Sequence, residues 1–396
     1  MTVVYFDRSK KIFARRQKTP LFWGKDKELL PFSGQLNREC SFRLVLKGEA
    51  AGPIIGILAT KSQKGVISGS RDFYIRIQQK LQEKAGGLSF LFSLEDIRGE
   101  TINGLFWDTG NGKWLRAIFP LPDTVYNRIS SREEELAESF LQFSALLKQK
   151  GIPFFNPHFL NKYHLYETLL QQPEIAPFLP ETVQVTDQNH FYCFLEQHRD
   201  VYVKPAARSQ GYGIRRVIQH ENGQFEYACP YSSRKFTDFA AVWWEIGKLL
   251  EKEAYLAQKT VQTVPLEGKK YDYRVHAHFN GKQYEVTGVG IRLARPGGIT
   301  THTAKGGEAA PLPPGANTSI VKEITPLIAA CGTALSKAYG FFGEFTADIA
   351  PGLDGSLYLF ELNAKPMEFD EPEIEEKKTE KLVDLFYMLS GYGPDD

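Results

Sequence analysis

Three short β-favouring runs, separated by polar turns, dominate the first fifty residues. They read "TVVYF", "KIFARR" and "SFRLVL". Such runs, bounded by turn residues, are typical of short strands. We therefore expect residues 1–50 to form a small β-rich unit. No residue pattern in it indicates chemistry, so its expected role is packing or partner binding.

The pattern changes over residues 51–155, where apolar runs alternate with helical periodicity. "GPIIGILAT" is an apolar strand, "RDFYIRIQQKLQEKAGG" has the spacing of a helix, and "SREEELAESFLQFSALLKQKG" predicts another. Strands that alternate with helices favour a parallel sheet. We expect a Rossmann-like domain, although no G-x-G-x-x-G opens its first helix, so no dinucleotide site is predicted.

Residues 156–396 predict a larger mixed α/β domain. "VYVKPAARSQGYGIRRVIQ" reads as a strand, a glycine loop and a strand, and "TDFAAVWWEIGKLLEKE" reads as a helix. Residues 255–365 are rich in strand patterns, with one helix at about 317–338. The tail pattern "EEKKTEKLVDLFYMLSGYG" is an amphipathic helix.

Composition narrows the class of protein. The 396 residues exceed one ordinary domain, and 48 basic against 47 acidic residues leave a net charge of +1. This balance argues against a nucleic-acid binder. The four cysteines are far apart, which predicts neither a disulfide framework nor a zinc knuckle. No apolar run is long enough for a membrane span, and the N-terminus lacks a signal-peptide pattern, so a cytoplasmic location is expected.

The glycine loop is the first candidate for chemistry. Lys204 ends a β-run, and Gly211 and Gly213 follow it. Glycines allow close backbone approach, so N–H groups can meet phosphate oxygens, and a lysine adds a point charge. The flanking strands make a hairpin over phosphates, not a P-loop. By itself the pattern also suits an ordinary surface hairpin.

A second candidate lies near the C-terminal end, in "GEFTADIA" and "LYLFELNAKP". Glu361 and Asn363 are two residues apart on a predicted strand, so their side chains share a face. A hairpin would bring Asp348 beside them. Carboxylate and amide oxygens are ligands suited to Mg²⁺. The alternative is that Glu361 and Asn363 only organise the turn before Pro366.

These motifs resemble those of ATP-grasp ligases over residues of about 155–390. Within that superfamily the chain is most similar to the YheC/YheD family, described as endospore coat-associated proteins. The closer resemblance rests on "PETVQVTD", "VYVKPAARSQGYGI", "DYRVHAHFNG" and "FELNAKP". The resemblance implies an α/β chain with an α+β ATP-grasp fold over 156–396, which includes a lid subdomain of about 185–260. This domain is preceded by a Rossmann-like pre-ATP-grasp domain over 51–155 and the β-rich unit over 1–50. The superfamily motifs occur in order at Lys162, Lys204 before "QGYG", 255–261, 272–274 and Asp348 with Glu361-x-Asn363.

The resemblance also implies roles for individual residues. ATP would be bound with Mg²⁺, as two ions. Lys162 and Lys204 would bind the phosphates. The implied lid over the phosphates consists of Ser209, Gln210, Gly211 and Gly213. The implied adenine-binding hinge consists of Gln258, Lys259 and Thr260. The implied metal ligands are Asp348, Glu361 and Asn363.

Two departures affect the acceptor side of the implied site. Relatives of glutathione synthetase and ribosomal-protein glutamate ligases carry Arg-x-Asn before a Gly-Gly, where this chain has Thr300 and His302. D-alanine–D-alanine ligases carry Arg two residues before the metal Asp, where this chain has Thr346. An acyl phosphate still needs a cation. Arg274 and Arg292 are the expected catalytic cations, with Arg295 as a further candidate, and His276 and His302 are candidate acid–base groups or plain polar side chains.

The resemblance implies an ATP-dependent carboxylate–amine ligase that forms an amide or peptide bond through an acyl phosphate, linked to sporulation. Its partners would be small-molecule or peptide carboxylates and amines, with spore-coat proteins as further partners. Two alternatives stay open: a phosphotransferase with the same fold, and a structural spore-coat protein that keeps the fold without the reaction. The expected location is the cytoplasm or the spore coat.

Overall fold

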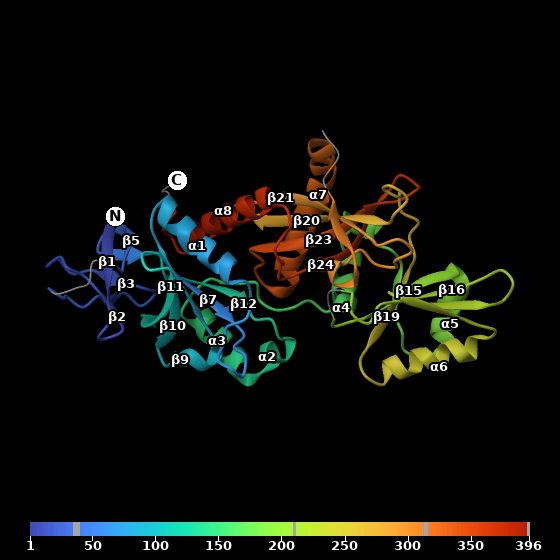
Figure 1. Cartoon of the computed structure of the whole chain (residues 1–396), viewed down its shortest axis with the longest axis horizontal. Helices are drawn as coiled ribbons and strands as arrows, with labels where there is room; N and C mark the ends of the chain where they lie inside the picture. Colours follow the sequence, from blue (N-terminus) through green and yellow to red (C-terminus); the bar gives the residue numbers. More distant parts are fainter. Residues whose placement is uncertain (35–39, 209–210, 311, 313–315, 394–396) are drawn as a thin grey trace.

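The strands form four sheets in the part of the chain that the structure describes. The structure, a computed structural model, describes residues 1–34, 40–208, 211–310, 312 and 316–393. The sheets are numbered here by their order in the sequence. Along the molecule the first and second sheets lie at one end, the fourth stands in the middle and the third is at the other end (Figure 1).

The first sheet contains the expected N-terminal β-rich pattern. Its strand order is β2-β1-β5-β6-β3-β4. Phe6 and Phe13 of this sheet contact Phe106 of the second sheet, with ring centroids 4.9 and 5.1 Å apart. The two sheets therefore share one aromatic core. The strands are β1 (Thr2–Asp7), β2 (Ile12–Ala14), β3 (Phe22–Trp23), β4 (Glu28–Leu29), β5 (Ser41–Lys47) and β6 (Ala50–Gly52).

The second sheet has the expected parallel centre. Its order is β11-β10-β8-β7-β12-β13, where β8, β7, β12 and β13 run parallel and β10 and β11 are antiparallel. Ser70 caps the first helix by accepting from the N–H of Phe73, which starts its apolar stripe. The elements are β7 (Ile54–Ala59), α1 (Arg71–Lys84), β8 (Leu88–Phe92), η1 (Leu94–Asp96), β9 (Ile97–Arg98), β10 (Thr101–Asp108), β11 (Lys113–Pro120), β12 (Thr124–Arg128), α2 (Arg132–Leu136), α3 (Glu138–Gln149) and β13 (Phe154–Phe155).

The prediction of a single helix over "SREEELAESFLQFSALLKQKG" is wrong. Ala137 adopts an extended conformation that separates α2 from α3. Beside the break, Glu135 turns inward and accepts hydrogen bonds from Asn127 and from the N–H of Phe159, both at 2.8 Å. The helical periodicity of the segment gave no indication of these partners, which lie outside it.

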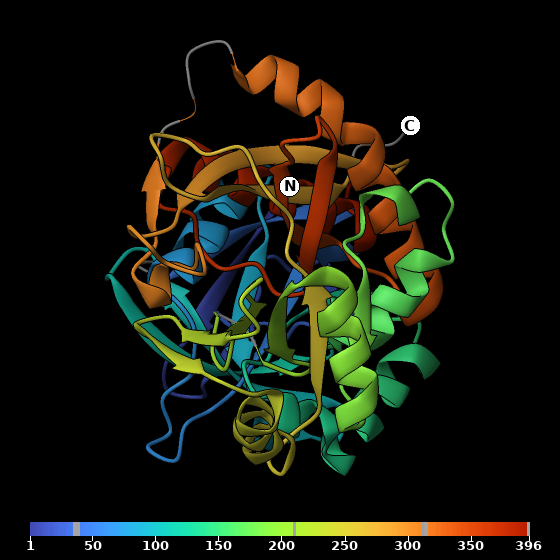
Figure 2. The same cartoon turned by 90° about the vertical axis from the view of Figure 1, so that its right-hand side faces the viewer.

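The third sheet is antiparallel, in the order β14-β19-β15-β16-β17-β18, and contains the expected strand–glycine loop–strand. Helices α5 and α6 pack on it through one apolar cluster, and Figure 2 shows these elements (green to yellow) in front. Trp244 on α6 is 64% exposed, so it is not a core residue. The elements are α4 (Lys162–Leu170), η2 (Ala176–Phe178), β14 (Thr182–Gln184), α5 (Gln188–His198), β15 (Asp200–Pro205), β16 (Arg215–Gln219), β17 (Phe225–Cys229), β18 (Ser232–Phe236), α6 (Phe239–Leu250) and β19 (Tyr255–Lys259).

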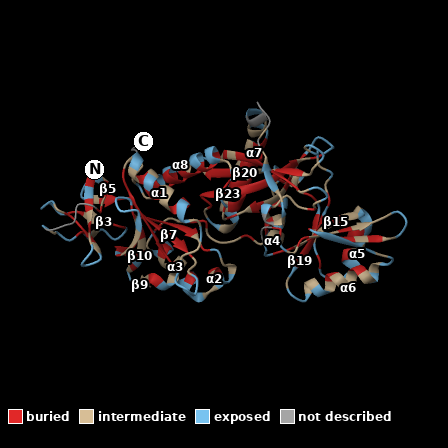
Figure 3. Ribbon diagram, viewed as in Figure 1, coloured by how far each residue is buried: buried red, intermediate tan, exposed pale blue. Residues whose placement is uncertain are grey.

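The fourth sheet is a layer between two long helices. Its order is β22-β21-β20-β23-β24. Val275 and Ala277 of β20 pack with α7 in one cluster, whereas α8 contacts β20, β21 and α1. The strand centres are buried and the outer helix faces are exposed (Figure 3). The elements are β20 (Tyr271–Phe279), β21 (Tyr284–Leu293), η3 (Thr303–Lys305), β22 (Glu308–Ala310), α7 (Ala316–Tyr339), β23 (Glu344–Pro351), β24 (Leu357–Asn363) and α8 (Pro372–Leu389).

Helix α8 also joins the second and fourth sheets. Leu382 and Phe386 of α8 belong to the same buried cluster as Ile55 of β7 and Phe73 of α1. The face of the fourth sheet that α8 covers, which is called the polar face below, therefore turns toward the second sheet. Among the described helices, none combines the length and the apolarity needed to cross a membrane.

Candidate functional site

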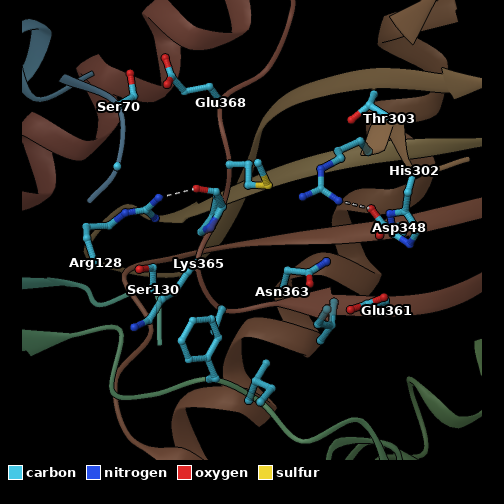
Figure 4. Close-up of a pocket in the computed structure, with 18 of the residues that line it drawn as sticks. Ser70, Arg128, Ser130, His302, Thr303, Asp348, Glu361, Asn363, Lys365 and Glu368 are labelled. Carbon is cyan, nitrogen blue, oxygen red and sulfur yellow. Dashed lines mark hydrogen bonds and ion pairs between the residues drawn. The ribbon is translucent and has the colours of Figure 1, made fainter. Parts of the chain in front are cut away.

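Two connected hollows meet at the polar face of the fourth sheet. The larger, about 540 Å³, lies between the fourth sheet and the end of β12 and is called the cleft below (Figure 4). The smaller, about 110 Å³, lies against the third sheet and is called the small hollow. Asp272, Thr301, His302, Asp348 and Glu361 line both. A ligand at this junction could therefore occupy both spaces.

A row of charged residues crosses three adjacent strands at the junction. Arg274 of β20 lies opposite Asp348 of β23, which lies opposite Glu361 of β24. Residues directly opposite on one face of a sheet are close enough to interact, and Arg274 Nη1 donates to Asp348 Oδ1 at 2.9 Å. Asn363 lines the same cleft (Figure 4). The structure thus brings together the three residues expected to bind a metal.

Lys162 and Lys204 reach the same row from separate elements. Lys162 begins α4, whose N-cap Asn161 fixes the start of the helix, and its Nζ forms an ion pair with Glu361 Oε1. Lys204 lies on β15 and donates to Gln258 Oε1 at 2.5 Å. Burial lowers the pKa of Lys204 to about 8, against the opposing charge of Glu361. A nearby anion would therefore strengthen the charged form of Lys204.

The described part of the glycine loop lies beside His302, which lines both hollows. Gly211 and Gly213 have φ of +69° and +76°. A Cβ at Gly211 would lie 2.8 Å from His302 Cδ2, and one at Gly213 would lie 3.0 Å from the Tyr255 hydroxyl. Both positions therefore favour glycine by their conformation, and a Cβ at either would also press on its neighbours. The other two residues expected in the lid, Ser209 and Gln210, lie outside the described residues.

The expected hinge residues do not all face the small hollow. Gln258 and Lys259 line it, and Gln258 also donates to Thr182 Oγ1 at 3.1 Å. Thr260 is not part of the lining, because its hydroxyl and its N–H both donate to Asp200, at 2.8 and 3.0 Å. The reasoning from sequence missed the apolar walls, which are Tyr202, Ile214, Val261, Ile299 and Phe360. Tyr202 could have been found, because it shares a strand face with Lys204.

The two expected catalytic arginines both line the cleft. Arg292 of β21 lies opposite Asp272 and pairs with Glu371 at 3.1 Å. Burial, and then the charge of Asp348, raise the pKa of Asp272 to about 7. Arg295, the further candidate, does not line the cleft and instead stacks on Tyr231 with its guanidinium 4.5 Å from the ring centroid.

The positions where the chain departs from related ligases and the two candidate acid–base histidines have different surroundings. His302 lines both hollows, and Thr300 lines the small one. His276 and Thr346 are fully buried and line neither. His276 is therefore not placed to exchange a proton with a ligand in the cleft, whereas His302 is.

The far wall of the cleft was not predicted. It contains Arg128, the last residue of β12, Ser130 just beyond that strand, and Lys365 (Figure 4). Arg128 Nη2 donates to the carbonyl of Pro366 at 2.9 Å, and Lys365 Nζ donates to the carbonyl of Ile129 at 2.6 Å. Lys365 stands in the "FELNAKP" stretch, but nothing in the sequence around Arg128 points to this wall.

The residues at the junction fit Mg²⁺ and a nucleoside triphosphate. Asp348, Glu361 and Asn363 offer the oxygen donors that Mg²⁺ prefers. Lys162 and Lys204 would face the phosphates, under a loop in which two glycines leave room for close backbone approach. The aromatic and aliphatic walls of the small hollow suit a flat apolar group such as a base.

Comparison with known proteins places the chain in a family. A sequence model described as YheC/D like ATP-grasp matches residues 151–389. The endospore coat-associated protein YheD of Bacillus subtilis (strain 168) is 29% identical over 333 residues, which cover 80% of this chain and 73% of YheD. YheC of the same organism, also named endospore coat-associated, is 21% identical over 324 residues, covering 76% of this chain and 88% of YheC.

The fold is also found among solved structures. D-alanyl-alanine synthetase A of Vibrio cholerae O1 biovar eltor str. N16961 matches with a TM-score of 0.51 at 14% identity, over 86% of this chain and 99% of that chain. This likeness shows that the fold, a mixed α/β chain with an α+β ATP-grasp arrangement, is shared. The match over residues 151–389, more than half of the chain, shows that the chain belongs to the YheC/D-like ATP-grasp family.

Proposed function

We propose that the protein is an ATP-dependent carboxylate–amine ligase that makes an amide or peptide bond. The observation that carries the proposal is the row of Arg274, Asp348 and Glu361 across three strands, with Lys162 paired to it from α4. This row combines metal-binding oxygens with cations for phosphate and for a developing anion. The likeness to a fold that bears the name of D-alanyl-alanine synthetase supports the same class of reaction.

In the proposed reaction, a substrate carboxylate oxygen takes the γ-phosphoryl group of ATP, and ADP leaves. The nitrogen of an amine then forms a bond to the carbonyl carbon, phosphate leaves and the nitrogen loses a proton. Mg²⁺, as two ions, supplies charge neutralisation at the phosphates. The location proposed for this reaction is the cytoplasm, where ATP is available.

The residues of the row and those around it each have a proposed task. Asp348, Glu361 and Asn363 would hold the metal, and Lys162 and Lys204 would hold phosphate oxygens. Arg274 would stabilise negative charge on the acyl group, because its guanidinium is already oriented by Asp348 at 2.9 Å. Arg292 would act beside it, although Glu371 and Asp370 compete for its charge at 3.1 and 3.8 Å.

The cleft also leaves space for the substrates. It continues from the row to Arg128, Ser130 and Lys365, beyond the position proposed for the phosphates (Figure 4). This extension is lined by both cations and polar groups, which suits amino-acid or short-peptide carboxylates. The residues expected for the hinge, Gln258 and Lys259, would meet the base in the small hollow.

A structural role in the spore coat is the second candidate, and the names of both relatives favour it. In that case the protein would assemble with coat proteins and the cleft would have no turnover. A phosphotransferase is a third reading, in which ADP forms without an amide. The three differ in their products.

The deciding experiment is a screen for ADP release with pools of amino acids, peptides and cell-wall precursors, followed by mass spectrometry of the products. A ligase yields ADP and a new amide in equal amounts, and both are lost when Mg²⁺ is withheld. ADP with a phosphorylated product would favour the phosphotransferase. Nucleotide binding without any product, in a protein that still assembles into a coat, would favour the structural role.

Arg274→Ala and Arg292→Ala test the acceptor side within that screen. We expect each variant to keep its affinity for Mg-ATP within a few-fold and to lose amide formation, since neither residue is proposed to bind the phosphates. Affinity and product are measured on the same preparations. A variant that forms product at the full rate would remove that arginine from the mechanism.

A further inference from the structure

A second polar cluster is buried on the same face of the fourth sheet, away from the charged row. His276 and His278 lie two residues apart on β20, and Glu344 of β23 lies directly opposite His278. All three side chains are at most 1% exposed. Glu344 precedes Asp348 by four residues on one strand, which is about 13 Å at the usual rise. The cluster is therefore separate from the proposed magnesium site.

The facing atoms of the cluster lack hydrogen bonds. His276 Nε2 and His278 Nε2 lie 3.2 and 3.4 Å from the same oxygen, Glu344 Oε2. None of these three atoms has a hydrogen-bond partner among the described residues, although the Glu344 oxygen lies within ion-pair distance of both nitrogens. Buried polar atoms without a partner are costly and rare in folded proteins. Three that converge on one point call for a ligand.

The spacing of these atoms matches a coordination shell. Zn²⁺ binds histidine nitrogen at about 2.0–2.1 Å and carboxylate oxygen at about 2.0–2.2 Å. Two donors at those lengths in a tetrahedron are about 3.3 to 3.5 Å apart. The two nitrogen–oxygen separations fall close to that value, and the donor atoms of the three residues all lie within 4.8 Å of one another.

Outer contacts hold the donors in the required state. Thr287 Oγ1 lies 3.0 Å from Nδ1 of both histidines and donates its single proton to the carbonyl of His276 at 3.2 Å. It then accepts from both Nδ1–H groups, which leaves the Nε2 lone pairs free. The second oxygen of Glu344 accepts from the Tyr126 hydroxyl. Histidine and carboxylate ligands of metals are typically oriented by such second contacts.

We propose that His276, His278 and Glu344 form a binding site for one divalent first-row metal ion, with Zn²⁺ the best match to the donor set. Three protein ligands leave one position of a four-coordinate ion for a water molecule. The ion would bind as the chain folds, because its ligands come from separate strands and are buried. It would tie β20 to β23 behind the wall of the cleft.

The charges around the cluster define the competing arrangement. Burial lowers the pKa of His276 and His278, which favours the neutral imidazoles that a metal needs. Arg128 lies 3.7 Å from Glu344 Oε1, and Lys378 is near but paired with Glu375 at 2.8 Å. Without an ion, the negative charge of Glu344 would be balanced by Arg128 and by a proton shared with the histidines. The experiment must separate these two states.

The test is the metal content of the full chain, expressed in zinc-supplemented medium and passed through gel filtration. All first-row metals are quantified together by mass spectrometry. We expect about one ion per chain in the wild type and a large loss in His278→Gln, which removes one nitrogen ligand. Thr287→Val keeps all three ligands and should weaken zinc binding by roughly 10–100-fold in competition with a chromophoric chelator.

Two control variants keep the cluster intact. Glu361→Gln changes the proposed magnesium site, and His164→Gln replaces an exposed histidine of α4. Both should retain the ion. A wild type without any first-row ion would establish the metal-free arrangement instead. Retention of the ion in His278→Gln would show that the ion binds elsewhere. If that variant does not fold, unchanged zinc affinity in Thr287→Val would equally overturn the proposal.

Discussion

At the scale of single residues, Lys204 shows how burial prepares the site for an anion. Its amino group is enclosed between Gln258, which accepts its hydrogen bond, and the ring of Phe360, whose centroid is 5.9 Å away. Burial without a full counter-charge lowers the pKa of this lysine to about 8. Phosphate groups would supply that counter-charge, so binding and protonation are linked.

This linkage predicts the pH dependence of nucleotide binding. Lys204 is charged below pH of about 8 and loses its proton above it. The affinity for Mg-ATP should therefore be constant below that pH and should fall above it, by up to about tenfold per pH unit. Calorimetric titration between pH 7 and about 9.5 measures this. Lys204→Arg keeps its charge throughout, and its affinity should not change with pH over the same range; an equal decline in both proteins would assign the effect to another group.

Glu361 gives the second prediction at this scale. Glu361→Gln keeps the shape of the side chain and removes one charge from the proposed metal site. We expect near-normal folding, with ADP formation slower by roughly 100-fold or more, because several kcal/mol of charge stabilisation are lost. The matched control is Glu308→Gln, which removes a glutamate that also pairs with a lysine, Lys269 at 2.6 Å, but lies outside both hollows. Wild-type rates in the first variant would place the metal elsewhere.

At the scale of elements, the strand period made it predictable that the residues proposed to bind the metal lie together. Glu361 and Asn363 share a face because they are two apart, and the turn after β23 brings Asp348 opposite. The far wall was not predictable, because Arg128 meets Pro366 and Lys365 meets Ile129 across more than two hundred residues. Period and spacing carry no information on such contacts.

The loop between β15 and β16 yields a prediction at the same scale. Gly213→Ala adds a Cβ at positive φ, 3.0 Å from Pro205 Cγ, and should displace the loop from the phosphate region. We expect the affinity for Mg-ATP to fall by tenfold or more, which corresponds to about 1.4 kcal/mol.

Gly223→Ala is the control for backbone strain. Gly223 has φ of +79° and stands in the neighbouring turn between β16 and β17, where a Cβ would meet nothing within 4 Å. Both variants should lose stability in thermal unfolding, Gly213→Ala at least as much as Gly223→Ala, but Gly223→Ala should bind nucleotide normally. Equal binding in the two variants would show that the loop does not cover the nucleotide.

At the scale of the whole molecule, Asn156 connects the second and fourth sheets. Its side chain donates to the carbonyls of Glu344, at 2.8 Å, and Ala364, and accepts from the N–H of Gly343 at 2.9 Å. This residue lies next to the expected boundary at 155. The division into 1–50, 51–155 and 156–396 stays a prediction, because shared cores and contacts of this kind cross it.

Asn156→Ala tests how strongly the parts depend on each other. The change leaves three buried backbone groups without partners, at a cost of about 1–3 kcal/mol for each group. We expect the free energy of unfolding in urea to fall by roughly 3 kcal/mol or more. Asn222→Ala is the control, because its side chain is exposed and its hydrogen bonds within the described part of the chain are to Gln224. A stability change as small as that of the control would show that the two sheets are joined mainly by α8.

The central claim, that the junction of the two hollows binds Mg-ATP, is tested most directly by calorimetric titration of the wild type with ATP, with and without Mg²⁺. We predict one site per chain, an affinity in the micromolar to millimolar range, and binding that depends on Mg²⁺. Absence of heat, together with no shift in thermal unfolding at millimolar nucleotide, would contradict the claim.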